Sequence, residues 1–183
     1  MSAEVGRAMA ESPKRVVMSG YPASGKSTLA AALADRLGFC LISKDAMLMT
    51  LYTAFQFGAG DAAASMRTGA AAWAVFWLQA RASPRAVLDT NIQPSELRQM
   101  DELRSLGGTL VEVRCECPAD LAKARYAARA SVGHPAQRHT ALDDERLALY
   151  ARPTGVGDII AVDTSLPVDV DSVAGQVRLK LGL

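Results

Sequence analysis

One nine-residue segment constrains the fold of this chain more than any other. Residues 20–28 read Gly-Tyr-Pro-Ala-Ser-Gly-Lys-Ser-Thr and fit the phosphate-cradling pattern G-x-x-x-x-G-K-[ST]. The apolar residues 15–19 before it are typical of a strand, and the Ala- and Leu-rich residues 29–37 after it are typical of a helix. A loop of this composition between a strand and a helix predicts a site for nucleotide phosphates.

The chemistry expected of this loop follows from the charge of a triphosphate. Glycines let the backbone wrap until successive N–H groups point at the phosphates, and the helix that follows adds its positive dipole end. Lys26 is predicted to reach the β- and γ-phosphates, and the Ser27 hydroxyl to hold the Mg²⁺ that bridges them. We therefore expect ATP and Mg²⁺ as cofactors. The expected nucleotide-binding residues of the loop are Gly20, Tyr21, Pro22, Ala23, Ser24, Gly25, Lys26, Ser27 and Thr28.

Length and charge favour one domain with local charge clusters. The chain has 183 residues, 50% of them hydrophobic, which suffices for one full core. Residues 1–14 are predicted to be a flexible N-terminal tail and residues 15–183 a single domain. The formal net charge of +1 gives no global field that would draw the chain to nucleic acid or to a membrane. No apolar run approaches the length of a membrane span.

The cysteines indicate the compartment. There are three, at positions 40, 115 and 117, and an odd count with two of them two residues apart favours reduced thiols. We therefore expect a cytoplasmic protein. The sequence leaves the oligomeric state open.

Strand-like and helix-like patterns alternate along the chain. The strand-like runs are residues 15–19, 39–42, 86–89, 109–115 and 159–162. The helix-like patterns between and after them are residues 29–37, 46–55, 61–80, 95–106, 118–130, 143–150 and 172–181. This alternation predicts an α/β protein with the P-loop NTPase fold, in which a five-stranded parallel sheet is sandwiched by helices.

Ligands of such sheets bind beyond the carboxyl ends of the strands. Polar residues follow four of the strands, at 43–45, 89–91, 116–117 and 163–164. The first two groups are expected to flank the strand that feeds the phosphate loop, so they are the candidates for chemistry.

Asp45 is the candidate general base. Phosphoryl transfer to a hydroxyl needs a carboxylate within hydrogen-bond reach of the attacking oxygen, opposite the leaving nucleotide. The alternative is that Asp45 only caps the helix that follows it. Its neighbour Lys44 is expected to lie on the surface rather than to be a second phosphate ligand.

Asp89 ends a strand at the position where an acidic residue orients Mg²⁺ through water or supports the acceptor site. Thr90 and Asn91 add short hydrogen-bonding groups at the same strand tip. The alternative is a turn in which the Asp89 side chain merely closes the strand.

Positive charge gathers in residues 118–140, which contain Lys123, Arg125, Arg129 and Arg138 around Gly133-His134-Pro135. A helix, a Gly- and Pro-containing loop and a second helix predict a small helical lid that closes over bound nucleotide. Arg125 and Arg129 lie four residues apart and share one helical face, so both are candidates for the phosphates. The alternative is a solvated helix face. Which arginine contacts the γ-phosphate stays open.

Most of the few aromatic side chains lie in residues 47–77. A buried core explains part of this clustering, yet the segment lies between Asp45 and Asp89, where an acceptor pocket is expected. We therefore expect an apolar wall on the acceptor side. Arg67 is the cation inside this segment and is a candidate for meeting an anionic acceptor.

Four motifs together resemble a known family. They are the loop at 20–28, Ile42-Ser-Lys-Asp45, Val87-Leu-Asp-Thr-Asn91 followed by Pro94, and Arg125-Tyr-x-x-Arg129. The set resembles the P-loop kinases of the AAA-type group related to the kinase domain of bacteriophage polynucleotide kinase, from Arg15 onward. The resemblance implies that Asp45 accepts the hydroxyl proton, that Asp89 to Asn91 line the acceptor site, and that Arg129 belongs to the phosphate-contacting lid.

One position departs from that family. Polynucleotide kinases carry an arginine three residues beyond the catalytic Asp, where it grips the acceptor's phosphate, and this chain has Leu48. The sequence therefore favours an ATP-dependent kinase with a small, partly apolar hydroxyl acceptor, with Asp45, Lys26 and Arg129 as catalytic residues. A polynucleotide 5′-hydroxyl kinase is the first alternative. A nucleotide-binding ATPase or switch protein is an alternative of another class.

Overall fold

The computed structural model describes residues 12–55, 62–130 and 141–183. The strands are β1 (Lys14–Gly20), β2 (Cys40–Ser43), β3 (Arg85–Asp89), β4 (Thr109–Glu116) and β5 (Asp158–Asp163). The helices are α1 (Lys26–Leu37), α2 (Lys44–Ala54), α3 (Ala62–Ala82), α4 (Leu97–Ser105), α5 (Ala119–Ala130), α6 (Asp144–Ala148) and α7 (Val170–Leu181). Every strand and helix expected from the sequence is present, with ends that differ from the expected ones by at most three residues.

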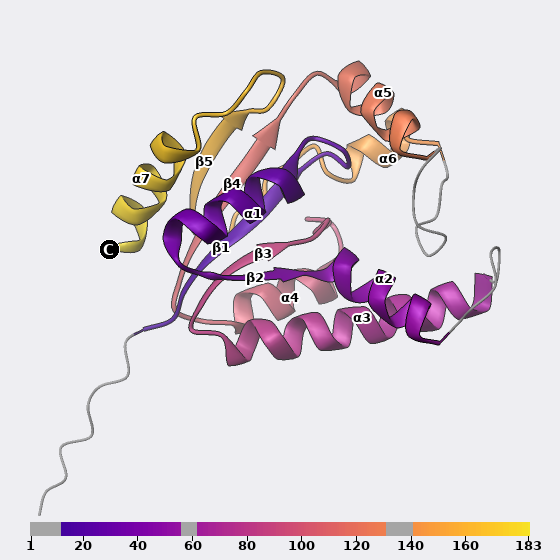
Figure 1. The fold of residues 1–183 in the computed structure, drawn as a ribbon, viewed down its shortest axis with the longest axis horizontal. Helices are drawn as coiled ribbons and strands as arrows, with labels where there is room; N and C mark the ends of the chain where they lie inside the picture. Colours follow the sequence, from indigo (N-terminus) through magenta and orange to yellow (C-terminus); the bar gives the residue numbers. More distant parts are fainter. Residues whose placement is uncertain (1–11, 56–61, 131–140) are drawn as a thin grey trace, which may run out of the picture.

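The five strands form one parallel sheet in the order β2-β3-β1-β4-β5, flanked by helices (Figure 1). This confirms the predicted fold. One expectation about neighbours is wrong, because only β3 pairs with β1 on that side, whereas β2 pairs with β3 at the sheet edge. The polar group after β3 therefore lies next to the phosphate loop, and the group after β2 lies one strand further out.

The sheet buries a separate core on each face because successive side chains of a strand point to opposite sides. Val16 and Met18 of β1 pack with α1 and α7, and Val17 packs with α3 and α4. The helices contribute Leu29, Leu33, Val173 and Val177 to the first core and Phe76, Trp77, Met100 and Leu103 to the second. Both faces being covered explains why the central strands read as apolar runs.

Arg15 fastens the two helices of the second face to the sheet. Its side chain is only 2% exposed. The guanidinium donates to the carbonyls of Arg81 and Ser83, where α3 ends, and to those of Leu106 and Gly107, where α4 ends. Helix ends leave carbonyls without partners, and a fork of donors from one arginine satisfies four of them.

Two expectations fall partly outside the described residues. Residues 1–11 of the expected tail are not described, and Lys14 belongs to β1. Of the expected lid at about 118–140, the structure describes α5 up to residue 130, and α6 follows the gap. None of the described helices is both long and apolar enough to cross a membrane.

Replacing Arg15 with methionine removes these donors while keeping an unbranched side chain. We expect Arg15→Met to lower the free energy of unfolding by about 2–4 kcal/mol, because buried carbonyls lose their partners. The measurement is urea unfolding. Arg104→Met is the control, since Arg104 is exposed and its ion pair with Asp101 lies within α4, so a change within about 0.5 kcal/mol is expected. Equal effects of the two variants would contradict the role of Arg15.

Candidate active site

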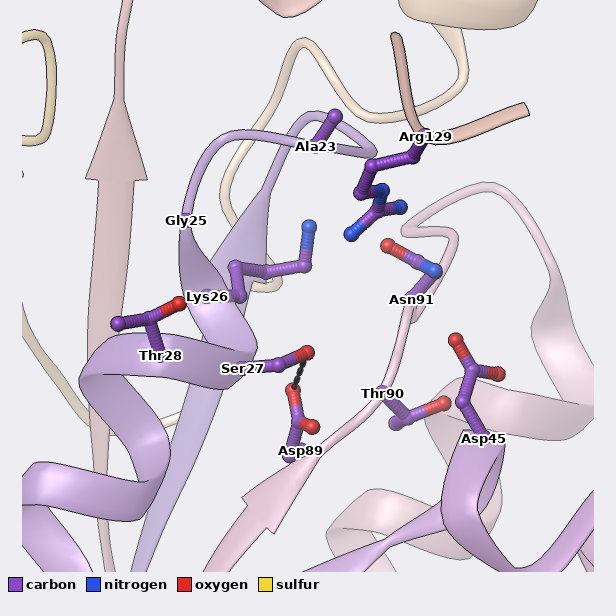
Figure 2. A pocket seen from close by; sticks show the side chains of 10 residues that line it. All are labelled: Ala23, Gly25, Lys26, Ser27, Thr28, Asp45, Asp89, Thr90, Asn91 and Arg129. Carbon is purple, nitrogen blue, oxygen red and sulfur yellow. Dashed lines mark hydrogen bonds between the residues drawn. The ribbon is translucent and has the colours of Figure 1, made fainter. Parts of the chain in front are cut away.

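The phosphate loop turns sharply because two glycines adopt left-handed backbone angles. Gly20 has φ 115°, and a Cβ on it would lie 2.1 Å from the Cys115 carbonyl oxygen of β4. Gly25 has φ 94° and is the N-cap residue of α1. Only glycine adopts such angles without strain and allows so close a backbone approach. The motif glycines thus hold the loop against β4 and aim the α1 N-terminus at the pocket (Figure 2).

Lys26 folds back onto this loop. Its ammonium donates to the carbonyl oxygens of Gly20 at 3.0 Å and Tyr21 at 2.5 Å, and the residue is 5% exposed. Burial lowers the pKa of Lys26 to about 8, with the nearby Arg129 adding a smaller contribution in the same direction. A buried ammonium whose hydrogen bonds go to neutral carbonyls attracts an anion such as a phosphate.

Asp89 joins the loop to the sheet edge through two hydroxyl groups. Ser27 Oγ donates to Oδ1 and Ser43 Oγ donates to Oδ2, each at 3.1 Å. Burial raises the pKa of Asp89 although both hydrogen bonds and Lys26 favour its charged form. The arrangement brings a hydroxyl and a carboxylate together beside the loop, which are ligand types that Mg²⁺ accepts.

Asp45 is not the cap of α2. The N-cap is Ser43, whose hydroxyl accepts from the Ala46 backbone N–H, and Asp45 lies in the first turn. The capping alternative for Asp45 is therefore wrong, and Asp45 lines the pocket with Lys26 and Ser27. Figure 2 shows Asp45 across the pocket from Lys26, with Thr90 and Asn91 between them.

Lys44 is not a surface residue as expected, because its side chain is only 17% exposed. Its ammonium lies 3.3 Å from Asp45 Oδ1 and 5.7 Å from the centre of the Trp73 ring. The aromatic face and the carboxylate both attract the cation, so they fix it between α2 and α3. Lys44 thereby holds the Asp45 side chain in place.

Polar atoms without hydrogen-bond partners lie in the phosphate loop and in the wall of the pocket. Among the described residues, Ser24 Oγ, Thr90 Oγ1 and Asn91 Oδ1 are buried and make no hydrogen bond. Thr90 and Asn91 line the pocket together with Asp45 and Asp89. Because an unpaired buried polar atom costs free energy, such atoms in a native fold indicate a ligand or water that completes them.

The two lid arginines have different places. Arg129 lines the phosphate pocket, and its guanidinium points into the space between Lys26 and Asn91 (Figure 2). Arg125 instead donates to the Thr164 carbonyl at 3.0 Å. Although both arginines lie in α5, Arg129 alone of the two lines the pocket that contains Lys26.

A second hollow of about 550 Å³ opens on the other side of the loop. Its walls come from the phosphate loop, α1, α5 and the segment between β5 and α7. They include Gly25, Leu29, Arg125, Arg129, Thr164, Leu166, Pro167 and Val168. The sequence reasoning missed the apolar residues 166–168, although the polar 163–164 after the fifth strand pointed to this edge of the sheet.

Two further candidates lie elsewhere. Arg67 is exposed on α3 and does not line the phosphate pocket. Leu48 is buried at 7% exposure and packs with Tyr52 and Ala72. The structure therefore joins Lys26, Ser27, Asp45, Asp89, Thr90, Asn91 and Arg129 in one pocket. The role of Ser43, which binds Asp89 and caps α2, was missed, although a serine directly before a helix is a capping signal.

Comparison with known proteins places the chain in a family. The family model of the AAA domain matches residues 16–153. A provisionally named kinase from Chloroflexus aurantiacus is 25% identical, with a TM-score of 0.79 over 93% of this chain and 100% of that chain. No curated protein matches the sequence.

Two enzymes with bound ligands share the fold at lower identity. Shikimate kinase from Acinetobacter baumannii, in complex with shikimate, is 18% identical with a TM-score of 0.61, covering 94% of this chain and 95% of that chain. APS kinase from Mycobacterium tuberculosis, in complex with AMPPNP and APS, is 22% identical with a TM-score of 0.58, covering 95% and 100%. The chain belongs to the AAA domain family and has the fold of the P-loop kinases.

The buried charge of Lys26 should make the stability of the nucleotide-free protein depend on pH. The unfolded chain holds this proton up to about pH 10.5 and the folded chain up to about pH 8. The unfolded state therefore binds more protons in that window, and the free energy of unfolding gains a rising contribution with pH. Below pH 8, burial of the charged Lys26 lowers the free energy of unfolding by its full amount.

We expect Lys26→Met to remove this contribution. The variant should be more stable than the wild type at pH 7 by on the order of 2 kcal/mol, should lose the rise between pH 8 and 10.5, and should no longer bind ATP. The measurements are urea unfolding across pH 7–10.5 and ATP titration calorimetry. Lys180→Met, an exposed α7 change, is the control. A Lys26→Met profile parallel to the wild type would contradict the burial argument.

Proposed function

We propose that this member of the AAA domain family is an ATP- and Mg²⁺-dependent kinase that phosphorylates a hydroxyl group of a small molecule. The observation that carries the proposal is the pairing of two half-sites in one pocket. Lys26 and the α1 N-terminus supply the cradle for the donor phosphates, and the Asp45 carboxylate comes from another element across the pocket. Thr90 and Asn91 lie between them with unpaired polar atoms.

The donor half is assembled from backbone and charge. The amides of the loop and of the first turn of α1 would surround the phosphates, and Lys26 would leave the carbonyls of Gly20 and Tyr21 for the β- and γ-phosphates. The 550 Å³ hollow beside the loop has the size and the mostly apolar walls to take the nucleoside. Its wall includes Arg125, whose planar guanidinium can stack on a base.

The oxygen donors beside the phosphate loop are of the types that Mg²⁺ binds. Ser27 and Asp89 present oxygen ligands 3.1 Å apart at the start of α1, and Mg²⁺ sites with phosphates use one or two carboxylates in addition. When bound, Mg²⁺ supplies charge neutralisation at the phosphate oxygens. Because burial raises the pKa of Asp89, this carboxylate would favour a nearby cation.

The acceptor half carries the proton. As the acceptor oxygen forms its bond to the γ-phosphorus, the bond from phosphorus to the β–γ bridging oxygen breaks and ADP leaves. The hydroxyl proton passes to the Asp45 carboxylate, which Lys44 holds in place. Thr90 and Asn91 would hold the acceptor hydroxyl through their unpaired atoms, and Arg129 would neutralise the charge of the transferring group.

The choice of a small acceptor rests on two findings. The position where a polynucleotide kinase would need an arginine is Leu48, which is buried against Tyr52 and Ala72 and is no phosphate ligand. Two proteins of the same fold, with shikimate and APS bound, are kinases with small-molecule ligands. A switch or ATPase role would not explain why the Asp45 carboxylate lies across the pocket from the phosphate loop.

Asp45→Asn tests the base. We expect phosphotransfer to fall at least about 100-fold, because the amide cannot accept the hydroxyl proton, while the ATP dissociation constant stays within about threefold. Product formation is followed by ³¹P NMR with a panel of small hydroxyl compounds, and ATP binding by calorimetry. Asp35→Asn, an exposed change in α1, is the control. Wild-type transfer rates in Asp45→Asn would refute the assignment, and ATP hydrolysis without transfer to any acceptor would refute the kinase.

A further inference from the structure

We propose that the hollow between α3 and α4 holds the body of the acceptor, and that this acceptor is a ring-bearing alcohol without net charge. The inference rests on the proposed function, because Asp45 activates the reacting hydroxyl. The hollow has a volume of about 540 Å³, which lies in the range of small-molecule pockets. Its walls are Ala70, Trp73, Ala74, Trp77 and Arg81 from one side and Glu96, Arg98, Gln99 and Glu102 from the other.

The aromatic wall is held by ring contacts. The rings of Trp73 and Trp77 stack with centroids 5.6 Å apart and an interplanar angle of 17°. Phe76 packs edge-on against both rings from within the core. Ala70 and Ala74 leave space in front of this wall. Such a wall favours a ring over a flexible chain, because both partners lose little conformational freedom on contact.

The rim of the hollow has no net charge. Arg81 and Glu102 form an ion pair with each other. Glu96 and Arg98 add one negative and one positive charge, and the Glu96 carboxylate accepts from the Arg98 backbone N–H. An acceptor with several negative charges would therefore meet as many repulsive as attractive groups. Together with Gln99, these side chains offer donors and acceptors that suit the hydroxyl groups of a neutral ligand.

Two elements link the hollow to the phosphate pocket. The chain after β3 places Thr90 and Asn91 in the phosphate pocket and Glu96, five residues later, in the hollow. On the other side, Trp73 forms the wall of the hollow and its ring also holds the Lys44 ammonium, which pairs with Asp45. A ring that contacts Trp73 from the hollow would therefore lie near the Lys44–Asp45 pair, which contains the expected base.

Tryptophan fluorescence tests this inference directly, because Trp73 and Trp77 are the chain's two tryptophans. The probes are D-glucose and myo-inositol as saturated rings, 4-methoxybenzyl alcohol as an aromatic ring, and a 5′-hydroxyl oligothymidylate as a polyanion. Titrated into the nucleotide-free full chain, at least one ring alcohol should change the emission saturably. The oligothymidylate should not. No response to any ring alcohol, or a tighter response to the polyanion, would overturn the assignment.

A filling variant locates the binding. Ala74→Phe occupies the hollow without adding a tryptophan and should raise the dissociation constant of the responding ring alcohol at least tenfold. Ala71→Phe is the matched control, since Ala71 is exposed on the same helix and outside the walls of the hollow, and it should change the constant less than twofold. Equal effects of the two variants would overturn the inference. Circular dichroism checks that both variants fold.

The two proposals fail separately. A ring alcohol that binds in the hollow but receives no phosphate in the presence of ATP and Mg²⁺ would refute the kinase function and leave the binding site standing. A small hydroxyl compound that is phosphorylated equally by wild type and Ala74→Phe would leave the kinase function standing and refute the hollow as the acceptor site.

Discussion

The buried ammonium of Lys26 is the interaction on which the candidate site depends. It lies at the junction of β1, the phosphate loop and α1, and it donates to the backbone carbonyls of Gly20 and Tyr21. Burial lowers its pKa to about 8, although the carboxylates of Asp89 and Asp45 act in the opposite direction, so the folded protein holds a cation at a cost in free energy. The same junction buries the Asp89 carboxylate, whose pKa burial raises. Burying these two charged groups lowers the stability of the folded protein, and bound triphosphate and Mg²⁺ would offset that loss. Functional sites commonly reduce the stability of a protein in this way.

The sheet brings the other groups to this junction. Because β3 pairs with β1, the residues after β3 follow the phosphate loop at the same edge, and β2 delivers α2 and Asp45 one strand further out. That spacing leaves room between Asp45 and the loop, which Thr90 and Asn91 line. The separation suits a reaction in which an acceptor oxygen must lie between a base and a phosphate. Arg129 reaches the same space from α5.

Much of the fold and part of the site could be predicted from local patterns. The glycine spacing of the loop is specific to phosphate-binding loops, which placed Lys26 and Ser27 at the phosphates. Ligands of a parallel sheet bind beyond the carboxyl ends of its strands, which placed Asp45 and Asp89 in the same pocket. The two lid arginines share a helical face and could not be separated by spacing, because only the tertiary contact of Arg125 with Thr164 distinguishes them.

Contacts between distant segments account for the rest. Lys44 was expected on the surface because lysines usually are, but Trp73, twenty-nine residues later in the sequence, supplies the aromatic face that buries it. Arg67 was a candidate because it lies in the segment between Asp45 and Asp89, but it is exposed on α3. The hydrogen-bond partners of the buried Arg15 lie 66 to 92 residues further along the sequence, so no local sequence pattern predicts them.

A crystal structure of the protein with Mg²⁺ and AMPPNP tests the central claim most directly. The account predicts that Lys26 Nζ leaves the carbonyls of Gly20 and Tyr21 for the β- and γ-phosphates, with Arg129 beside the γ-phosphate. It also predicts that the Asp45 carboxylate faces the γ-phosphorus across a gap that one hydroxyl oxygen can fill. A Lys26 that remains on the loop carbonyls, or an Asp45 carboxylate turned away from the γ-phosphate, would contradict it.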